Sequence, residues 1–389
     1  MTSLPDCPAK FDIDDTNIAL LGSDLEKRVR EHAGDKETAW QDAGLVPGIQ
    51  IWRIEQFKVV VWPKERYGSF YDGDSYIVLH TYKKDPKSAE LSFNLHFWLG
   101  RETTQDEAGV AAYKSVELDD HLDGVPVQYR EVQGYESQCF ISHFPRFVSL
   151  RGGVSTGFHH VSAPPEDSIH RLYNVSTSVF HSGTKTTSHL IVREVHPSGG
   201  SLVEGDVFVL DKGSKVWQFN TKQSVGKEKF KAAEFVQTLV SDRQGHAGVT
   251  VFDEGVSGAG TFLSELGLGA MPTQPAKRHQ EDSERTRRLF RVSDADTQVT
   301  FEPVTPISRS CLSSQDAFLL DDVHHPTAPA VYVWIGKESS LKERRLVMQY
   351  AQKYLHDNRE QQGGMGMAVS LVKINEGSEN DAFLHAIEK

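Results

Sequence analysis

Pairs of acidic residues recur three times in this sequence at equivalent places, and each pair could bind a metal ion. An aspartate precedes an apolar stretch, an aromatic stretch follows, and a glutamate then comes early in the next helical segment. The pairs are Asp74 with Glu107, Asp206 with Glu228, and Asp316 with Glu343. Ca²⁺ takes six to eight oxygen ligands, including bidentate carboxylates and backbone carbonyls. The two acids and the carbonyl before the aspartate would supply about half of such a shell.

A single pair of this kind has a plainer explanation, because Gly-Asp before a strand is usually a turn and an early helical glutamate is usually a cap. Three such pairs in the same order are hard to obtain by chance, so we interpret these acids as metal ligands. Each pair also follows a similar opening strand. These strands are Gln50–Ile54, Arg171–Val175 and Arg288–Val292.

The helix between Gln105 and Leu122 has the strongest local signals. Thr104 and Glu107 form a capping box, and Gly124 is placed to end the helix in a left-handed conformation. Asp119 stands in its last turn. The segment from Asp119 is not an EF-hand, because Arg130 occupies the twelfth position, where glutamate is required. Asp119 with the carbonyls of Gly124 and Pro126 would form an incomplete shell, which a partner's carboxylate could complete.

Alternating and helical periodicities predict the remaining elements. The expected strands are Val59–Trp62, Ser75–Tyr82, Leu91–Leu99, Val127–Glu131, Gln138–His143, His189–Val195, Asp206–Asp211, Asp316–Leu320, Val331–Ile335 and Met367–Ile374. The expected helices are Asp24–His32, Lys227–Val240, Leu341–Leu355 and Asp381–Ile387. In the second of these, Phe230, Ala233, Val236 and Val240 are expected on one face. Strands before and after one long helix predict an α+β fold, with helices packed on a mixed sheet.

Composition narrows the class of protein. A chain of 389 residues with 38% hydrophobic and 25% charged residues is typical of two or three globular domains. Its net charge of −12 argues against nucleic-acid binding. No apolar run is long enough to span a bilayer, and the first residues lack a signal peptide core. Three scattered cysteines predict reduced thiols and a cytoplasmic location.

No nucleophile motif, phosphate loop or zinc spacing is present, so we expect a binding protein and not an enzyme. A metal-dependent hydrolase that uses the acidic clusters remains a remote alternative. The acids lie in separate parts of the chain and share no pocket motif.

Several long motifs in the first half resemble the gelsolin family of actin-binding proteins, most of all its three-repeat severin and fragmin members. The motifs are GDSYIVL, FWLG-x4-QDEAG, VELDDHLDG, YREVQGYES and GGVSTGF. The resemblance implies three gelsolin-like repeats, each a central mixed sheet sandwiched between a long and a short helix. The implied boundaries are an extension at 1–46, repeats at 47–152, 169–266 and 288–389, and linkers at 153–168 and 267–287.

The resemblance further implies a Ca²⁺-regulated protein of the cytoskeleton that severs actin filaments, caps their barbed ends and can nucleate them. The implied metal ligands are, by site, Gly73, Asp74, Glu107 and Val154; Asp119, Gly124 and Pro126, shared with actin; Gly205, Asp206, Glu228 and Asp282; and Gln315, Asp316 and Glu343. The implied actin contacts are Gln105, Ala108, Ala111, Ala112, Tyr113, Val116 and Asp119.

The basic residues that resemble phosphoinositide sites in relatives are reduced here to Arg146, Arg151 and Arg171. Each basic residue near an anionic surface is worth roughly 1 kcal/mol, so we expect weakened lipid binding. Capping without severing is therefore the alternative function, because filament binding by the second repeat also uses basic residues.

Overall fold

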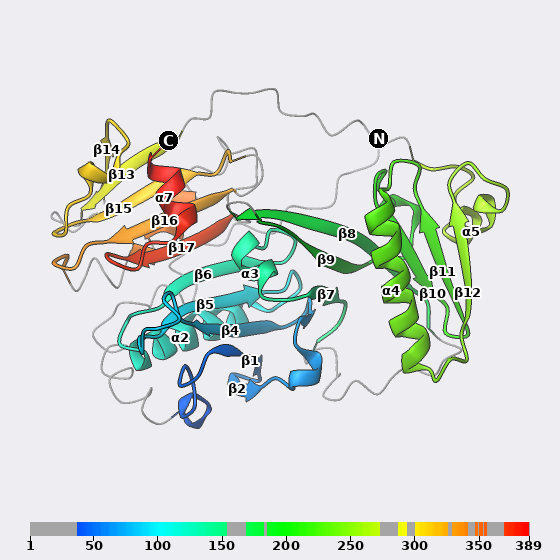
Figure 1. Ribbon diagram of the computed structural model, residues 1–389, viewed down its shortest axis with the longest axis horizontal. Coiled ribbons are helices and arrows are strands. Elements are labelled where there is room, and N and C mark those ends of the chain that lie inside the picture. The colour runs from blue at the N-terminus through cyan, green and yellow to red at the C-terminus, as the bar shows by residue number, and fades with distance from the viewer. Residues whose placement is uncertain are drawn as a thin grey trace. The chain divides into compact units, whose positions relative to one another are not determined.

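The computed structural model describes residues 37–153, 169–182, 185–272, 287–293, 300–325, 329–340, 369–388 and most of 347–355 (Figure 1). These residues divide into two compact units. The first unit contains residues 37–62, 74–137 and 287–388, and the second contains 63–73 and 138–272. The predicted helix Asp24–His32 lies outside the described residues.

The first unit is built on one sheet of ten strands, in the order β14-β13-β15-β16-β17-β6-β5-β4-β1-β2. The strands are β1 (Gly48–Glu55), β2 (Lys58–Val61), β4 (Ser75–Tyr82), β5 (Ser92–Leu99), β6 (Val127–Val132), β13 (Arg288–Ser293), β14 (Thr300–Val304), β15 (Ala317–Asp322), β16 (Ala330–Ile335) and β17 (Ser370–Asn375). Strands β6 and β17 join the parts that come from the two ends of the chain.

The second unit contains a sheet of seven strands, in the order β12-β11-β10-β8-β9-β7-β3. The strands are β3 (Ser69–Tyr71), β7 (Arg146–Leu150), β8 (Arg171–Ser182), β9 (Lys185–Val195), β10 (Val207–Asp211), β11 (Lys215–Asn220) and β12 (Gly248–Asp253).

The same four-strand pattern occurs three times in these sheets. In each case two antiparallel pairings are followed by one parallel pairing. The sets are β1-β4-β5-β6, β8-β10-β11-β12 and β13-β15-β16-β17. The parallel pairing requires a crossover between the third and fourth strands, and α2 (Gln105–His121) and α4 (Gly226–Asp242) supply it in the first two sets. In the third set, the described residues between 347 and 355 are helical.

Alternating side chains bury both faces of β8, β10 and β11, and α4 and α5 (Ala259–Glu265) cover opposite faces (Figure 1). Val207 and Val209 pack with Phe235 of α4, whereas Phe208 and Leu210 pack with Phe262 of α5. The predicted sandwich of one long and one short helix is therefore present around these strands.

The other helices follow the same principle. Helix α2 packs its Ala111 and Leu118 against Ile54, Ile77 and Leu95 of the ten-stranded sheet. At the other end of that sheet, Val347, Ala351 and Tyr354 pack on one face. The ring of Phe383 in α7 (Asp381–Glu388) lies 5.8 Å from that of Tyr332. These layers confirm the predicted α+β class.

One predicted strand is wrong. Gln138–His143 was expected to be extended, but Gln138–Ser142 forms helix α3. Phe140 and Ile141 are consecutive and both buried, which a strand with one buried face does not allow. Phe140 instead joins a cluster with Phe70, Phe144 and Phe147. A short apolar run of this kind cannot be assigned by periodicity alone.

The predicted inner face of α4 is also partly wrong. Phe230 is 63% exposed and Ala233 faces solvent, whereas Ala232, Phe235 and Val236 are buried. The helical stripe is therefore displaced by one residue along the first turns.

None of the described helices combines the length and the hydropathy that a bilayer span requires.

Candidate functional site

The first acidic pair lies where β4 begins and α2 begins. The side chain of Asp74 is 0% exposed, and its Oδ2 accepts hydrogen bonds from Tyr76 (3.3 Å) and Arg53 (3.4 Å). Only half of the predicted capping box is present: Thr104 Oγ1 accepts from Glu107 N at 3.2 Å, and Glu107 Oε2 accepts from the Thr104 hydroxyl at 3.1 Å in place of the Thr104 N–H. The two elements are tied together by Ser75 and Thr103, whose hydroxyls lie 2.9 Å apart.

Gly73, the preceding candidate ligand, is counted in the second unit, where its N–H donates to Gly152 O at 2.7 Å. A Cβ at Gly73 would lie 2.7 Å from that same oxygen, so only glycine fits. Val154, the fourth candidate ligand of this site, lies outside the described residues.

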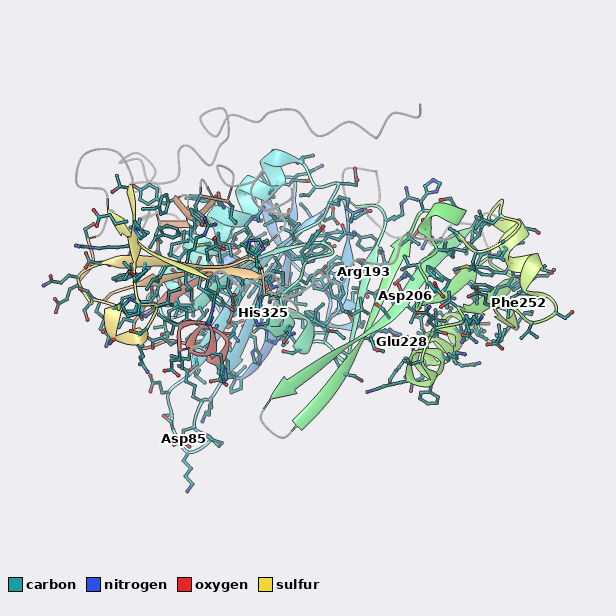
Figure 2. All side chains as sticks on the ribbon, turned by 90° about the horizontal axis from the view of Figure 1, so that it is seen from above. Asp85, Arg193, Asp206, Glu228, Phe252 and His325 are labelled. Carbon is teal, nitrogen blue, oxygen red and sulfur yellow. The ribbon has the colours of Figure 1, made fainter. Side chains whose placement is uncertain are left out.

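The second acidic pair lies in the second unit (Figure 2). Asp206 Oδ2 accepts from Asn174 Nδ2 at 2.7 Å, and Glu228 Oε1 accepts from the hydroxyl of Thr177 at 3.3 Å. Because Asn174 and Thr177 both belong to β8, that strand contacts both acids. Gly205, with a φ of +97°, supplies the turn before Asp206. Asp282 lies outside the described residues.

The third pair is only partly described. Asp316 Oδ1 accepts from Arg291 Nη2 at 2.7 Å, and Gln315 precedes it with an exposed side chain. Glu343 lies outside the described residues. The pairing of this third aspartate with a helix glutamate therefore stays a prediction.

The main-chain oxygen of each of the three aspartates accepts a hydrogen bond at the equivalent place in its strand set. The main-chain oxygens of Asp74 and Asp316 accept hydrogen bonds of 3.0 Å from the N–H groups of Gly100 and Gly336. At the equivalent place in the second unit, the hydroxyl of Thr221 donates to Asp206 O at 2.6 Å. This shared pattern fixes each aspartate at the same point of its four-strand set.

The fourth candidate site lies at the end of α2, and residues of β17 occupy it. Lys373 Nζ lies 3.1 Å from Asp119 Oδ2, and Asn375 Nδ2 donates to Gly124 O. The side chains of Asp119 and Lys373 are only 5% and 13% exposed. Strand β17 is held there by antiparallel pairing with β6, which joins Lys373 to Gln128 and two further pairs.

The chemistry of these donors fits a hard divalent cation, because all of them are carboxylate or carbonyl oxygens. At the end of α2, Asp119 Oδ1 is buried and has no hydrogen-bond partner among the described residues. A buried carboxylate oxygen without a donor is costly, and a cation would satisfy it. When bound, Ca²⁺ would neutralise this charge and connect it to an acid of a partner. Pro126, the remaining candidate ligand, is buried and offers only its carbonyl.

The helix residues predicted to contact a partner divide into two groups. Ala108, Ala112, Tyr113 and Val116 are half-buried on α2. Ala111 is fully buried in the core, so its inclusion among the partner contacts is wrong. Gln105 begins the helix. The alanine at 111 fills the same helical spacing as its neighbours, and the sequence could not show which of them faces the sheet.

A buried pair of titratable residues was missed at the sequence level. His96 Nδ1 lies 2.9 Å from Glu131 Oε1, and both side chains are fully buried. Ser137 donates to Glu131 through its N–H (2.7 Å) and its hydroxyl (2.6 Å). Burial raises the pKa of Glu131 to about 7, against the lowering effect of these hydrogen bonds. Burial and the nearby His80 place the pKa of His96 well below its usual value. Adjacent strands bring the two together, and no local motif marks them.

The three basic residues considered for phosphoinositides lie in the second unit near β7 and β8. Arg146 donates to the hydroxyl of Thr238 at 3.2 Å, and Arg171 lies 3.8 Å from Glu194. The N–H of Arg151 also donates to Glu194. Two of the three guanidinium groups are thus engaged by neighbours in their own unit.

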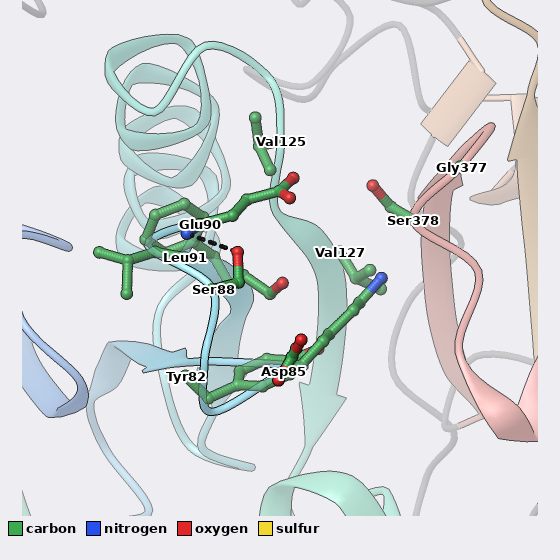
Figure 3. A pocket seen from close by; sticks show the side chains of 12 residues that line it. Tyr82, Asp85, Ser88, Glu90, Leu91, Val125, Val127, Gly377 and Ser378 are labelled. Atoms are coloured by element: carbon green, nitrogen blue, oxygen red, sulfur yellow. Dashed lines mark hydrogen bonds between the residues drawn. The ribbon is translucent and has the colours of Figure 1, made fainter.

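A cavity of about 430 Å³ lies between the β4–β5 turn, the start of β6 and the turn after β17 (Figure 3). Val125 and Gly377 line it, next in sequence to Gly124 and close to Asn375. Its walls are mixed, with Asp85 and Glu90 beside Tyr82. Solvent can therefore reach the margin of the contact between β6 and β17.

Comparison with known proteins gives consistent matches. The family model described as Gelsolin repeat matches residues 56–141 and 300–384. Gelsolin-like protein 1 of Lumbricus terrestris is 40% identical over 84% of this chain and 85% of its own length. Severin of Echinococcus granulosus is 36% identical, over 89% of this chain and 90% of its own. A protein of Platymeris rhadamanthus, named actin depolymerising venom protein gelsolin 1, is 36% identical over 88% of both chains.

Proposed function

This chain belongs to the gelsolin family, and on that premise we propose that it is a Ca²⁺-regulated actin-binding protein of the cytoplasmic cytoskeleton. It severs filaments, caps their barbed ends and can nucleate new ones. Relatives that are called severin and actin depolymerising protein, and that match this chain over nearly their whole length, support this proposal. Gelsolin-family proteins act by binding and not by catalysis, so the hydrolase alternative is dropped.

The contact between β17 and the end of α2 is the single observation that carries the proposal. In the resemblance, Asp119 and Gly124 complete a Ca²⁺ site together with a glutamate of actin. In this structure Lys373 and Asn375 already engage both residues. The ammonium group of Lys373 therefore takes the place of Ca²⁺ beside Asp119, and actin cannot reach this site until β17 moves away from it.

Calcium control follows from this arrangement. A ligand shifts an equilibrium between two states only by as much as it binds one state better than the other. Ca²⁺ at the end of α2 requires the carboxylate that Lys373 holds, so the ion favours the state in which β6 and β17 are separated. Metal-free protein stays closed, and calcium together with actin opens it.

Imaging of single fluorescent actin filaments tests the proposed function. Purified protein should produce breaks along filaments in Ca²⁺ and none in chelator. Arrested barbed ends without breaks would leave capping and remove severing. Unchanged filaments in both conditions would remove actin as the partner.

Capping without severing is the second candidate, and the second unit gives the reason for it. Severing requires binding along the filament side, for which basic residues are favourable. Glu194 lies 3.8 Å from Arg171 and offsets its charge, and the guanidinium of Arg146 is held by the hydroxyl of Thr238. The breaks counted in the imaging experiment distinguish the two candidates.

The double variant Lys373→Ala and Asn375→Ala should need about ten-fold less Ca²⁺ for half-maximal capping. It removes a hydrogen bond to a charged group, worth about 1.5–3 kcal/mol, and leaves Asp119 buried without its cation. The measurement is barbed-end elongation of pyrene-labelled actin over a series of Ca²⁺ concentrations.

Lys215→Ala is the matched control, because it removes an exposed lysine from β11 in the second unit. An unchanged Ca²⁺ midpoint in the double variant would mean that the two side chains do not hold the closed state.

A further inference from the structure

The first strand of each four-strand set carries one residue that faces the candidate metal aspartate. Strand register pairs Arg53 with Tyr76, Asn174 with Phe208, and Arg291 with Phe318. In each set the aspartate lies two residues before that partner. Residues so related are diagonal neighbours on one face of an antiparallel pair. Arg53, Asn174 and Arg291 therefore hold equivalent positions, and we call each the facing residue of its site.

The facing residues contact their aspartates with different charges. Asn174 donates a neutral hydrogen bond of 2.7 Å to Asp206. Arg291 forms an ion pair of 2.7 Å with Asp316. Arg53 lies 3.4 Å from Asp74, so its contact is the longest of the three.

The charge of Arg53 is balanced by other groups. Its guanidinium also bonds to Glu55 and lies 4.8 Å from the ring of Trp62. Arg53 and Glu55 together add no net charge near Asp74. Arg291 differs, because its ion pair with the candidate ligand is shorter, no second acid pairs with it among the described residues, and its side chain is 48% exposed.

We propose that the facing residue sets the order in which the calcium sites fill, so that the second-repeat site at Asp206 binds first and the third-repeat site at Asp316 binds last. This inference rests on the proposed calcium binding and adds the order of filling to it. A guanidinium beside the metal repels a divalent cation and occupies one of the oxygens that the ion needs. Asn174 also engages one oxygen of its aspartate, but it carries no charge and so does not repel the ion.

Coulomb's law gives the size of the effect. A charge of +2 and a charge of +1 about 5 Å apart in an aqueous dielectric repel each other enough to change a binding constant roughly ten-fold. Because Arg291 is half exposed, it can swing away into solvent when metal binds, so the penalty has this moderate size. The first-repeat site at Asp74 should lie between the other two, because Glu55 offsets Arg53.

Exchanging the facing residues tests this order. Equilibrium dialysis of the full chain against radioactive Ca²⁺, without actin, gives the stepwise binding constants. Asn174→Arg should weaken the tightest constant about ten-fold. Arg291→Asn should tighten the weakest constant by a similar factor. Lys215→Asn, which removes one exposed charge from β11, controls for a general effect of net charge.

Two further measurements separate the possible failures. Glu228→Gln should weaken the tightest constant and so assign it to the second repeat. Thermal unfolding in chelator shows whether each variant is folded, and Arg291→Asn tests the inference alone if Asn174→Arg does not fold.

Calcium binding with constants that neither exchange moves by more than two-fold would overturn the inference and leave the proposed function in place. The same holds if Glu228→Gln weakens a constant other than the tightest. A parent protein that binds no calcium would overturn both.

Discussion

Asp119→Asn should cap barbed ends about a hundred-fold more weakly than the parent at saturating Ca²⁺. In the proposed complex, Asp119 shares a metal ion with an acid of actin. Removing one partner of a buried charged contact at an interface costs about 2–5 kcal/mol, and each 1.4 kcal/mol is ten-fold in affinity. The measurement is the concentration of protein that halves barbed-end elongation.

The same substitution should make the separation of β6 from β17 depend less on Ca²⁺, because the closed state is weakened and the carboxylate through which the ion favours the open state is gone. The neutral amide that replaces the Asp119 carboxylate cannot form an ion pair with Lys373, so the closed state would lose stability. If one variant shows both weaker capping and easier separation of β6 from β17, then Asp119 acts in the closed state and in the actin-bound state. A purely structural residue would not show both effects. Equal losses of capping and of thermal stability in chelator would instead assign Asp119 to the fold alone.

Asp123→Asn is the matched control. Asp123 is an exposed carboxylate just after α2 with a φ of +58°, and asparagine tolerates that conformation well. This variant changes the charge of the helix end by the same amount. It should cap like the parent.

Glu131→Gln should change how stability depends on pH. The folded pKa of Glu131 is about 7, compared with an ordinary value of 4.5, so the folded protein holds this proton more tightly than the unfolded chain does. Stability from this group is therefore fully present below pH 4.5 and is lost as pH rises through 7. Moving a carboxyl pKa over this interval is equivalent to about 3 kcal/mol.

Glutamine resembles the protonated acid and does not titrate. Its carbonyl can accept from Ser137, and its amide can donate to neutral His96. The free energy of unfolding of the variant minus that of the parent should therefore increase by about 3 kcal/mol between pH 4.5 and pH 8. The low pKa of His96 acts in both proteins in the same sense, with stability lost as pH falls below 6.5, and largely cancels in the difference.

Urea unfolding followed by tryptophan fluorescence at both pH values measures this difference. Glu302→Gln, on the exposed side of β14, is the control and should show no such trend. A difference that stays constant from pH 4.5 to pH 8 would show that Glu131 is already ionised in the folded protein.

Local features of this protein could be predicted from sequence because their causes are local. Thr104 caps the start of α2 as expected, and the chain turns left-handed just after the helix, at Asp123 (φ of +58°) as well as at Gly124 (φ of +68°). The three aspartates stand at equivalent places because each precedes a strand of the same pattern. Short-range spacing determines all of these.

Features that depend on distant partners could not be predicted. Lys373 and Asp119 are 254 residues apart, and nothing near either residue indicates the other. The inward side of α2 and α4 also depends on the sheet, which is why Ala111 and Phe230 were placed on the wrong faces. Helix α3 forms where Phe140 can enter an aromatic cluster whose other members include Phe70, from a distant part of the chain.

The pairing of β6 with β17 covers three residue pairs, and this short length has a consequence for the activated protein. If β6 and β17 separate, the ten-stranded sheet becomes two sheets. Each of them then has an edge strand with unpaired N–H and C=O groups. Such edges are templates for adding another strand, from the same chain or from a neighbour. On the proposed calcium control, the open protein would therefore tend to associate with its own copies, and re-pairing of β6 with β17 after calcium falls would prevent this.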